Sequence, residues 1–441
     1  MTVARFALRG ALGEIGRAGR ALLTERGFAS DPEVCQRVTR ILERVRVEKD
    51  VALRALAREL DGVELDELEV PRAALVGALD TLDPQLRRAM ERAASNIGRV
   101  HRAIPLAATE VETEPGVIVG RRADPLDRVG VYAPGGRAAY PSSVLMGVIP
   151  ARVAGVREIT LCSPPSRQSG RPPNVLLAAA ALAGVDRVFA IGGAGAIAAL
   201  AYGTESVPKV HRIVGPGNAY VAEAKLQVGS LVGTDAPAGP SELLVIADAS
   251  ADPELVAGEM LAQAEHDVDA CVVCIVVGVG SVDIERAVGM RLAQQPRAGT
   301  IASALTRRGA LLTADSLEEA LSFAAEYAPE HLLLAVRDPE SLLSHVRNAG
   351  TVFLGAFASV AFGDYMTGAN HVLPTAGLAR SYSGLSTLDF VRWTTYQRVS
   401  PAAAQRLAAD VAVFAEAEGL TAHADAARAL ASPTERAEVA T

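Results

Sequence analysis

Predicted strands and helices alternate strictly along the middle of this 441-residue chain, and that alternation restricts the possible folds more than any other feature. Short β-branched segments predict strands at residues 158–162, 187–191 and 212–214, and helical patterns follow them at 174–183, 195–202 and 219–228. Such alternation is typical of βαβ units with right-handed crossovers and a parallel sheet. Ligands of these sheets bind at the carboxyl ends of the strands, where the loops are rich in glycine.

A second α/β unit is predicted in the C-terminal half. Its predicted elements are a strand at 243–247, a helix from about residue 253, a strand at 271–277, a helix at 316–325 and a strand at 332–336. A structural repeat would explain two such units, but the sequence shows no convincing internal similarity.

Length and charge narrow the class of protein. A chain of 441 residues is too long for one compact core and predicts two or more domains. Half of the residues are apolar and 21% are charged, which is typical of a well-buried α/β protein rather than a disordered one. The net charge of −8 argues against nucleic acid or an anionic membrane as the main partner. No apolar segment has the length of a membrane span, and we expect no secretory signal.

The four cysteines indicate a reducing compartment. Cys271 and Cys274 have the spacing of a redox or zinc pair, but they lie within a continuous apolar segment that predicts a buried strand. Residues three apart on a strand face opposite sides, so we expect plain core cysteines and a cytoplasmic protein.

Residues 1 to about 105 carry charged helical patterns and are interpreted as scaffold. One pattern starts at Pro84 and ends near His101. His101 lies among arginines, so we expect a solvated residue rather than a ligand.

Two glycine-rich loops follow predicted strands. Residues 192–198 contain G-x-G-x-x-A, which superficially matches a dinucleotide fingerprint. The acidic residue expected about 20 positions further on is missing, which disfavours a standard Rossmann site. The second loop, 214–218, ends at a helix start, where free N–H groups favour a phosphate or carboxylate. Asn218 could bind a ligand there or serve only as the N-cap of the helix.

Two short motifs carry chemically useful side chains. Gln263 and His266 are three apart on a predicted helix, so they leave the same face and could bind a metal or belong to an ordinary polar surface. Glu330 and His331 precede an apolar strand, where they could form an acid–base pair or an unremarkable surface pair.

The last third of the chain holds two further groups of candidates. Residues 363–375 form a predicted loop crowded with Gly, Asn, His and Asp, and loops of this kind often carry function. Residues 400–429 predict a helix pair whose periodicity explains the apolar positions but not Glu418 or His423.

Taken together, these stretches resemble histidinol dehydrogenase over nearly the whole chain. The resemblance rests on RVGVYAPGGRAAYPSSVLM (128–146), IVGPGNAYVAEAK (213–225), AGPSELLVIAD (238–248), LAQAEHD (261–267), APEHLLL (328–334), GDYMTGANHVLPT (363–375) and EAEGLTAHA (416–424). The probability that seven such motifs occur in this order by chance is very small.

The resemblance implies a set of site residues. It implies zinc ligands at Gln263, His266, Asp364 and His423, and a catalytic pair at Glu330 and His331. It implies substrate contacts at Ser241, Gln263, His266, His331, Asp364, His371, Glu418 and His423. It implies dinucleotide contacts at Tyr132 and Asn218, with Gly195 at a third such position.

The reaction that the resemblance implies is the zinc- and NAD-dependent four-electron oxidation of L-histidinol to L-histidine through histidinal, the last step of histidine biosynthesis. In this interpretation zinc holds and orients the substrate. His331 takes the alcohol proton and Glu330 activates the water that adds to the aldehyde.

The resemblance also implies an architecture: two incomplete Rossmann-like domains with parallel sheets, an N-terminal helical segment, and a helical C-terminal tail that packs on a partner subunit. The expected divisions are a helical segment at 1–24, an α/β domain at 25–112 plus 241–385 that carries the metal and acid–base residues, a dinucleotide-binding domain at 113–240, and a tail at 386–441 exchanged within a homodimer. Glu418 and His423 would then act on the partner's site.

One position departs from the family pattern. Gly195 stands where the family has a glutamine that contacts the cofactor, so we expect weaker NAD binding by one neutral hydrogen bond, worth about 0.5–1.5 kcal/mol. Three alternatives stay open: a paralogous zinc- and NAD-dependent dehydrogenase for another hydroxyl compound, a zinc hydrolase or lyase without a dinucleotide, and a non-catalytic protein that keeps the fold.

Overall fold

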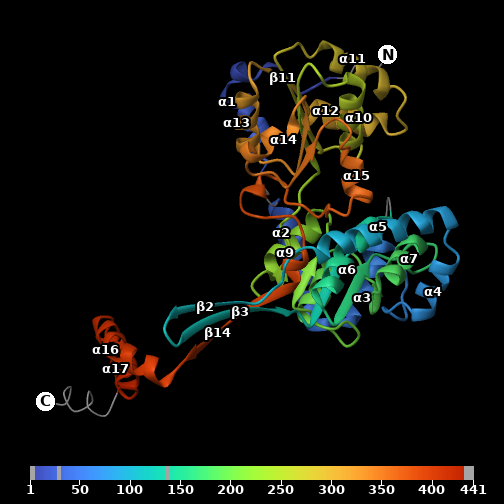
Figure 1. Ribbon diagram of the computed structural model, residues 1–441. Helices are drawn as coiled ribbons and strands as arrows, with labels where there is room; N and C mark the ends of the chain where they lie inside the picture. The colour runs from blue at the N-terminus through green and yellow to red at the C-terminus, as the bar shows by residue number, and fades with distance from the viewer. Residues whose placement is uncertain (1–4, 27–30, 136–138, 432–441) are drawn as a thin grey trace. The chain divides into compact units, whose positions relative to one another are not determined.

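A computed structural model describes residues 5–26, 31–135 and 139–431 (Figure 1). The chain divides into two compact units. One comprises Met1–Ala103 with Leu126–Phe390, and the other comprises Ile104–Pro125 with Val391–Thr441. Among the described residues, no helix combines the length and apolar character needed to cross a membrane.

The first unit contains a five-stranded parallel sheet in the order β6-β5-β4-β7-β8. Its strands are β4 (Arg128–Tyr132), β5 (Glu158–Ser163), β6 (Arg187–Ala190), β7 (Arg212–Val214) and β8 (Gly233–Thr234). The connecting helices are α6 (Pro141–Ala154), α7 (Asn174–Ala183), α8 (Gly193–Tyr202) and α9 (Ala219–Val228). The predicted alternation and the parallel sheet are confirmed.

The same unit contains a six-stranded parallel sheet in the order β1-β11-β10-β9-β12-β13. Its strands are β1 (Leu8–Ala11), β9 (Glu242–Ala247), β10 (Cys271–Val277), β11 (Ala310–Ala314), β12 (His331–Ala335) and β13 (Thr351–Leu354). Its helices are α10 (Pro253–Ala264), α11 (Val282–Leu292), α12 (Ala298–Arg308), α13 (Leu317–Tyr327), α14 (Pro339–Leu342) and α15 (Val360–Tyr365). Short helical turns lie at Leu343–His345, Leu378–Arg380 and Thr387–Phe390.

The two sheets share one strand order. In the five-stranded sheet, β4 lies third from one edge, with β5 and β6 on one side of it and β7 and β8 on the other. In the six-stranded sheet, β9 lies third from the β13 edge, with β10 and β11 on one side of it and β12 and β13 on the other. β1 is an extra edge strand on the second sheet. The structural repeat that the sequence left open is therefore present as topology.

Both faces of the six-stranded sheet are buried. Alternate residues of β9 and β10 pack against α10, α11 and α12 on one face, and the intervening residues pack against α13 and the N-terminal segment on the other. Figure 1 shows these helices around the sheet. Cys271 and Cys274 are buried and free, as predicted.

The N-terminal segment differs from its predicted helical form, because Leu8–Ala11 is the edge strand β1. It continues through a short turn (Leu12–Glu14) into α1 (Gly16–Thr24). The following elements are α2 (Pro32–Glu48), α3 (Asp50–Leu56), a π-helical turn (Ala57–Asp61), α4 (Arg72–Asp80) and α5 (Pro84–Arg102). The helices α2, α3, α8 and α9 cover one face of the five-stranded sheet.

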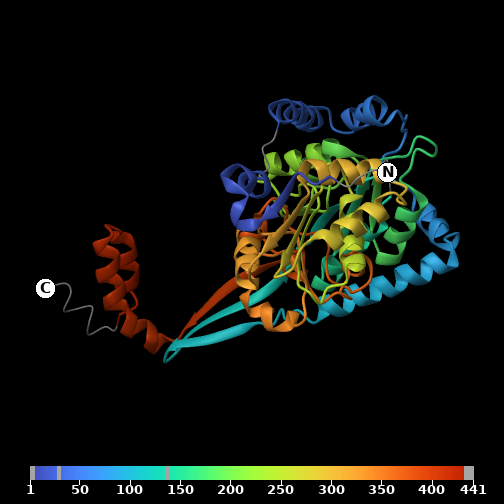
Figure 2. The same cartoon turned by 90° about the horizontal axis from the view of Figure 1, so that it is seen from above.

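The second unit is built on the antiparallel strands β2 (Thr109–Glu114), β3 (Val117–Pro125) and β14 (Val391–Val399), with β3 in the middle. The helices α16 (Pro401–Ala417) and α17 (Thr421–Arg428) pack side by side, as Figure 2 shows. Their buried contact consists of alanines, while Val413 and Phe414 are 68% and 71% exposed. The predicted C-terminal helix pair is confirmed.

His101 is buried, not solvated as expected. Only 3% of it is exposed, and neither ring nitrogen has a hydrogen-bond partner among the described residues. It continues the buried stripe of α5 formed by Met90, Ala93 and Ile97. Burial lowers the pKa of His101 because the charged imidazolium loses its hydration.

This burial predicts an acid-sensitive contribution to stability. Since the folded pKa lies below the unfolded value of about 6.5, the unfolded chain binds the proton more readily, and stability falls as the pH drops below 6.5. We expect His101→Phe to lose less free energy of unfolding between pH 7.5 and 5.0 than the parent chain, by about 1–2 kcal/mol. Denaturant unfolding at both pH values measures this, with the exposed His345→Phe as control. Equal pH dependence in the parent and His101→Phe would contradict the assignment.

Candidate active site

The carboxyl edge of the five-stranded sheet carries the glycine-rich loops. β4 and β7 are neighbours, and the chain leaves them toward opposite sides of the sheet, which makes their carboxyl ends a topological switch point. Ligands of open α/β sheets bind in the crevice outside such a point. Tyr132 ends β4, and Gly215 to Asn218 follow β7.

A close backbone approach fixes the loop after β7. Gly215 has φ +112°, and a Cβ built on it would lie 2.1 Å from the carbonyl oxygen of Tyr132. Any side chain there would push the two loops apart. Asp235 accepts the Gly215 N–H at 2.7 Å, and the buried Lys225 donates to both the Gly215 carbonyl oxygen and Asp235. The loop is therefore held rigidly against β4.

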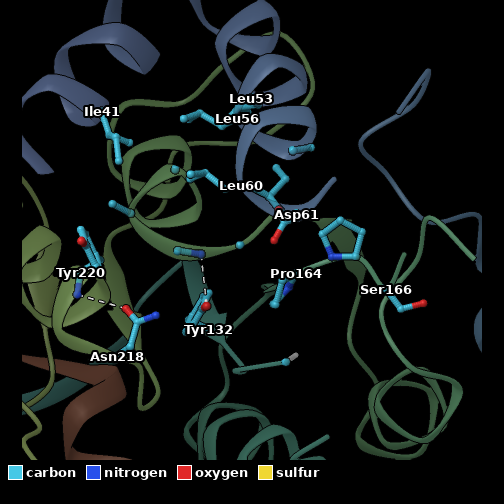
Figure 3. Close-up of a pocket in the computed structure, with 18 of the residues that line it drawn as sticks. Ile41, Leu53, Leu56, Leu60, Asp61, Tyr132, Pro164, Ser166, Asn218 and Tyr220 are labelled. Carbon is cyan, nitrogen blue, oxygen red and sulfur yellow. Dashed lines mark hydrogen bonds between the residues drawn. The ribbon is translucent and has the colours of Figure 1, made fainter. Parts of the chain in front are cut away.

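A cavity of about 740 Å³ opens at this switch point (Figure 3). Tyr132 lines it, and its hydroxyl oxygen accepts the Gly193 N–H at 3.2 Å, which leaves the phenolic proton for another acceptor. Asn218 also lines it. The Asn218 Oδ1 accepts the Tyr220 and Val221 N–H groups at 3.0 and 3.2 Å. The N-cap interpretation of Asn218 is thus confirmed, and its amide NH₂ stays available to a ligand.

Gly195 lines the same cavity under α3. A Cβ built on it would lie 3.1 Å from Leu56 Cδ1 and 3.7 Å from Leu53 Cδ2. A longer side chain at this position would require the Leu56 methyl group to move. Asp61 lies on the same wall, and burial raises its pKa to about 6 against the opposing effect of Arg167.

The remaining candidates of the first unit lie at the amino edge of the six-stranded sheet, not at a carboxyl edge. Ser241 immediately precedes β9, and Glu330 and His331 stand at the start of β12 beside it. The helix α10 starts beyond the carboxyl end of β9 and returns, so Gln263 and His266 reach the amino edge as well. These candidates thus do not lie at the carboxyl edge, where open α/β sheets usually bind their ligands.

The acid–base candidates lie in contact with one another. Glu330 Oε2 lies 3.4 Å from His331 Nδ1, and Asp364 Oδ1 lies 3.7 Å from His331 Nε2. His371 Nδ1 lies 2.9 Å from the carbonyl oxygen of Asp364. Burial lowers the pKa of His331, but the carboxylates of Glu330 and Asp364 raise it to about 10. The two carboxylates thus favour the protonated imidazolium of His331 in this structure.

A second cavity, of about 550 Å³, joins these groups to the glycine loop. Its lining includes Ser241, His266, Glu330, His331, Asp364 and His371 from the six-stranded side, together with residues 216–219 from the five-stranded side. Asn218 lines both cavities. A ligand in one cavity would therefore lie next to a ligand in the other.

Gln263 is 2% exposed, and its side-chain nitrogen has no hydrogen-bond partner among the described residues. An unsatisfied buried amide requires an explanation, and a bound ligand is one. The described residues contain no group of three or more His, Cys, Asp or Glu side chains placed to hold a metal. Glu418 and His423, both exposed, belong to the second unit.

Sequence reasoning missed Glu242 and Arg26. Both side chains are buried, 2% and 3% exposed, and Glu242 Oε2 lies 3.3 Å from Arg26 Nη1. The one available signal was a carboxylate at the first position of an otherwise apolar strand.

Comparisons with known proteins agree on one family. A family model described as "Histidinol dehydrogenase" matches residues 24–430. A histidinol dehydrogenase of Natronomonas pharaonis is 49% identical over 418 residues, which is 94% of this chain and 97% of that protein. One of Methanosarcina barkeri is 45% identical over 420 residues, covering 95% and 96%. The crystal structure of histidinol dehydrogenase from Elizabethkingia anophelis matches with a TM-score of 0.92 and 36% identity, covering 97% of this chain and 98% of that one.

Proposed function

This chain belongs to the histidinol dehydrogenase family, which makes it an oxidoreductase, and we propose that it catalyses the zinc- and NAD-dependent oxidation of L-histidinol to L-histidine through histidinal. This reaction is the last step of histidine biosynthesis. The observation that carries the proposal is the pair of cavities that share Asn218, one at a nucleotide-type switch point and the other lined by buried acid–base groups.

The proposed zinc ligands are Gln263, His266, Asp364 and, from the tail, His423. The presence of His266 and Asp364 in one cavity fits such a site. Imidazole, carboxylate and amide oxygen are suitable donors for this ion. Bound zinc would hold the imidazole and amino nitrogens of histidinol and so orient the reacting carbon.

The proposed cofactor residues are Tyr132, Asn218 and the position of Gly195. NAD would accept one hydride in each of the two oxidations. The amide NH₂ of Asn218 and the phenolic proton of Tyr132 are donors suited to an anionic nucleotide.

The proton chemistry is assigned to Glu330 and His331. His331 accepts the alcohol proton in the first oxidation and the proton of the hydrated aldehyde in the second. Glu330 activates the water that adds to histidinal. His371 and Ser241 bind the substrate beside them, and Glu418 forms an ion pair with it.

The assembly that we propose is a cytoplasmic homodimer in which the C-terminal tail acts on the partner. The exposed Val413 and Phe414 on α16 support a tail that packs on another surface. Glu418 and His423 then complete the partner's site. The predicted division into segments 1–24, 25–112 plus 241–385, 113–240 and 386–441 also remains a proposal.

The first test is the stoichiometry of the reaction. Zinc-loaded protein given L-histidinol and NAD should form two NADH for each histidine, because each oxidation removes one hydride. Absorbance at 340 nm and amino-acid analysis measure the two products. No NADH at saturating NAD with zinc bound would contradict the proposal and favour a paralogous dehydrogenase for another hydroxyl compound.

The metal and proton roles are separable by substitution. We expect His266→Ala to lose zinc and activity together, because it removes a ligand, and His331→Ala to keep zinc and lose turnover. Metal analysis of the purified variants, next to the exposed His345→Ala, measures this. A full zinc content in His266→Ala would refute the ligand assignment.

Gly195 should limit the affinity for NAD. Gly195→Gln adds one neutral hydrogen bond, so we expect the Kd for NAD to fall by about 2- to 12-fold, which corresponds to about 0.5–1.5 kcal/mol. Gly195→Ala is the matched control, because it makes the same Cβ contact with Leu56 but adds no hydrogen-bonding group. Titration calorimetry measures the Kd for NAD of both variants. If Gly195→Gln binds NAD no more tightly than Gly195→Ala, the absent hydrogen bond at this position does not limit the affinity.

A further inference from the structure

We propose that Glu242 is a positioning residue for the catalytic pair: its backbone and carboxylate orient Glu330 and His331, and Arg26 holds that carboxylate in place. This inference rests on the proposed function, in which Glu330 and His331 carry the proton chemistry. Glu242 itself contacts no substrate in this assignment and acts only through its neighbours.

Glu242 and Glu330 exchange hydrogen bonds. The Glu242 N–H donates to Glu330 Oε2 at 2.7 Å, and the Glu330 N–H donates to Glu242 Oε2 at 3.3 Å. Each residue thus fixes the carboxylate of the other with its own backbone. The first bond is the one that orients the Glu330 side chain, and hydrogen bonds from backbone N–H groups to a carboxylate are charge-assisted.

Glu242 also sets the orientation of His331. The Glu242 carbonyl oxygen lies 2.9 Å from His331 Nδ1. A carbonyl oxygen can only accept, so this contact requires a proton on Nδ1. His331 Nε2 is buried without a hydrogen-bond partner among the described residues and lies 3.7 Å from Asp364 Oδ1. The Glu242 carbonyl oxygen therefore fixes the plane and direction of the imidazole ring.

The same carboxylate anchors the loop that follows His371. Glu242 Oε1 accepts the Ala376 N–H at 2.8 Å. Ala376 has φ +55°, a conformation that non-glycine residues rarely adopt and that surrounding contacts must enforce. The carboxylate and backbone of one buried residue thus connect Glu330, His331 and the loop of His371.

The positive charge of Arg26 offsets the repulsion between two neighbouring buried carboxylates. Two buried carboxylates, Glu242 and Glu330, lie against each other, and burial raises the pKa of Glu242 to about 7 while Arg26 opposes the rise. The Arg26 guanidinium lies 3.3 Å from Glu242 Oε2 and 3.4 Å from the centroid of the Tyr327 ring. It also donates to the Tyr327 carbonyl oxygen. A buried charge of opposite sign stabilises the ionised form that accepts two N–H groups.

The test is the steady-state and half-reaction kinetics of Glu242→Gln in the full-length, zinc-loaded enzyme. In this variant only one end of the side-chain amide can accept, so the Glu330 and Ala376 N–H groups cannot each keep an acceptor oxygen of their own. The neutral amide also loses the charge attraction to Arg26. We expect kcat to fall by about ten- to a hundredfold, the cost of a misplaced catalytic group, with KM for histidinol and zinc content within twofold of the parent. The loss should be larger for histidinal oxidation, where Glu330 acts.

A merely structural Glu242 would give another result. It would lower the melting temperature and the zinc content, and both half-reactions would fall together with the fraction of folded enzyme. That outcome, or a kcat within twofold of the parent, would overturn the proposal. Glu318→Gln, at an exposed position of α13, controls for the substitution type. An inactive parent enzyme would instead refute the proposed function.

Arg26→Lys gives an independent answer if Glu242→Gln does not fold. Lysine keeps the charge but lacks the planar group that stacks on Tyr327 while it donates to the Tyr327 carbonyl oxygen. We expect a smaller fall in kcat, about three- to tenfold, at unchanged zinc content and KM. A fully active Arg26→Lys and a fully active Arg26→Met together would overturn the role of Arg26.

Discussion

Complete burial of the central strands governs where this protein can place polar chemistry. Every residue of β9, β10 and β12 is buried, with helices on both faces of the sheet. A polar group within such strands has no access to water and must be fully paired. Glu242 and His331 are the first residues of their strands, where loops can still supply partners. Chemistry is thereby confined to the strand ends.

The two sheets carry their candidate site residues at opposite ends of their strands. They share a strand order, yet Tyr132 and Asn218 lie at the carboxyl edge of one, and Ser241 and His331 lie at the amino edge of the other. At the carboxyl edge of the second sheet, the Asp248 N–H donates to the Ala335 carbonyl oxygen and its carboxylate accepts the Arg337 N–H. These bonds connect the ends of β9 and β12 to each other.

Local sequence patterns predicted the period and order of the elements well. The alternation of strands and helices, the buried cysteines and the N-cap at Asn218 all depend on contacts within a few residues, so they are visible in the sequence. The edge of the sheet at which His331 lies is not visible in the sequence, because it depends on how the connecting segments return across the sheet. Strand β1 was missed because it is short and half-exposed. His101 was recoverable, since it extends a helical apolar stripe.

The position of Asn218 ties the two cavities together thermodynamically. Its side-chain oxygen is committed to the backbone of α9, so only its NH₂ group can face ligands, and it can only donate. An acceptor that takes one of these protons from one cavity fixes the amide plane seen from the other. If occupancy of one cavity changes the affinity of the other, linkage requires the factor to be the same in both directions. A single cap residue is thus shared by two binding surfaces.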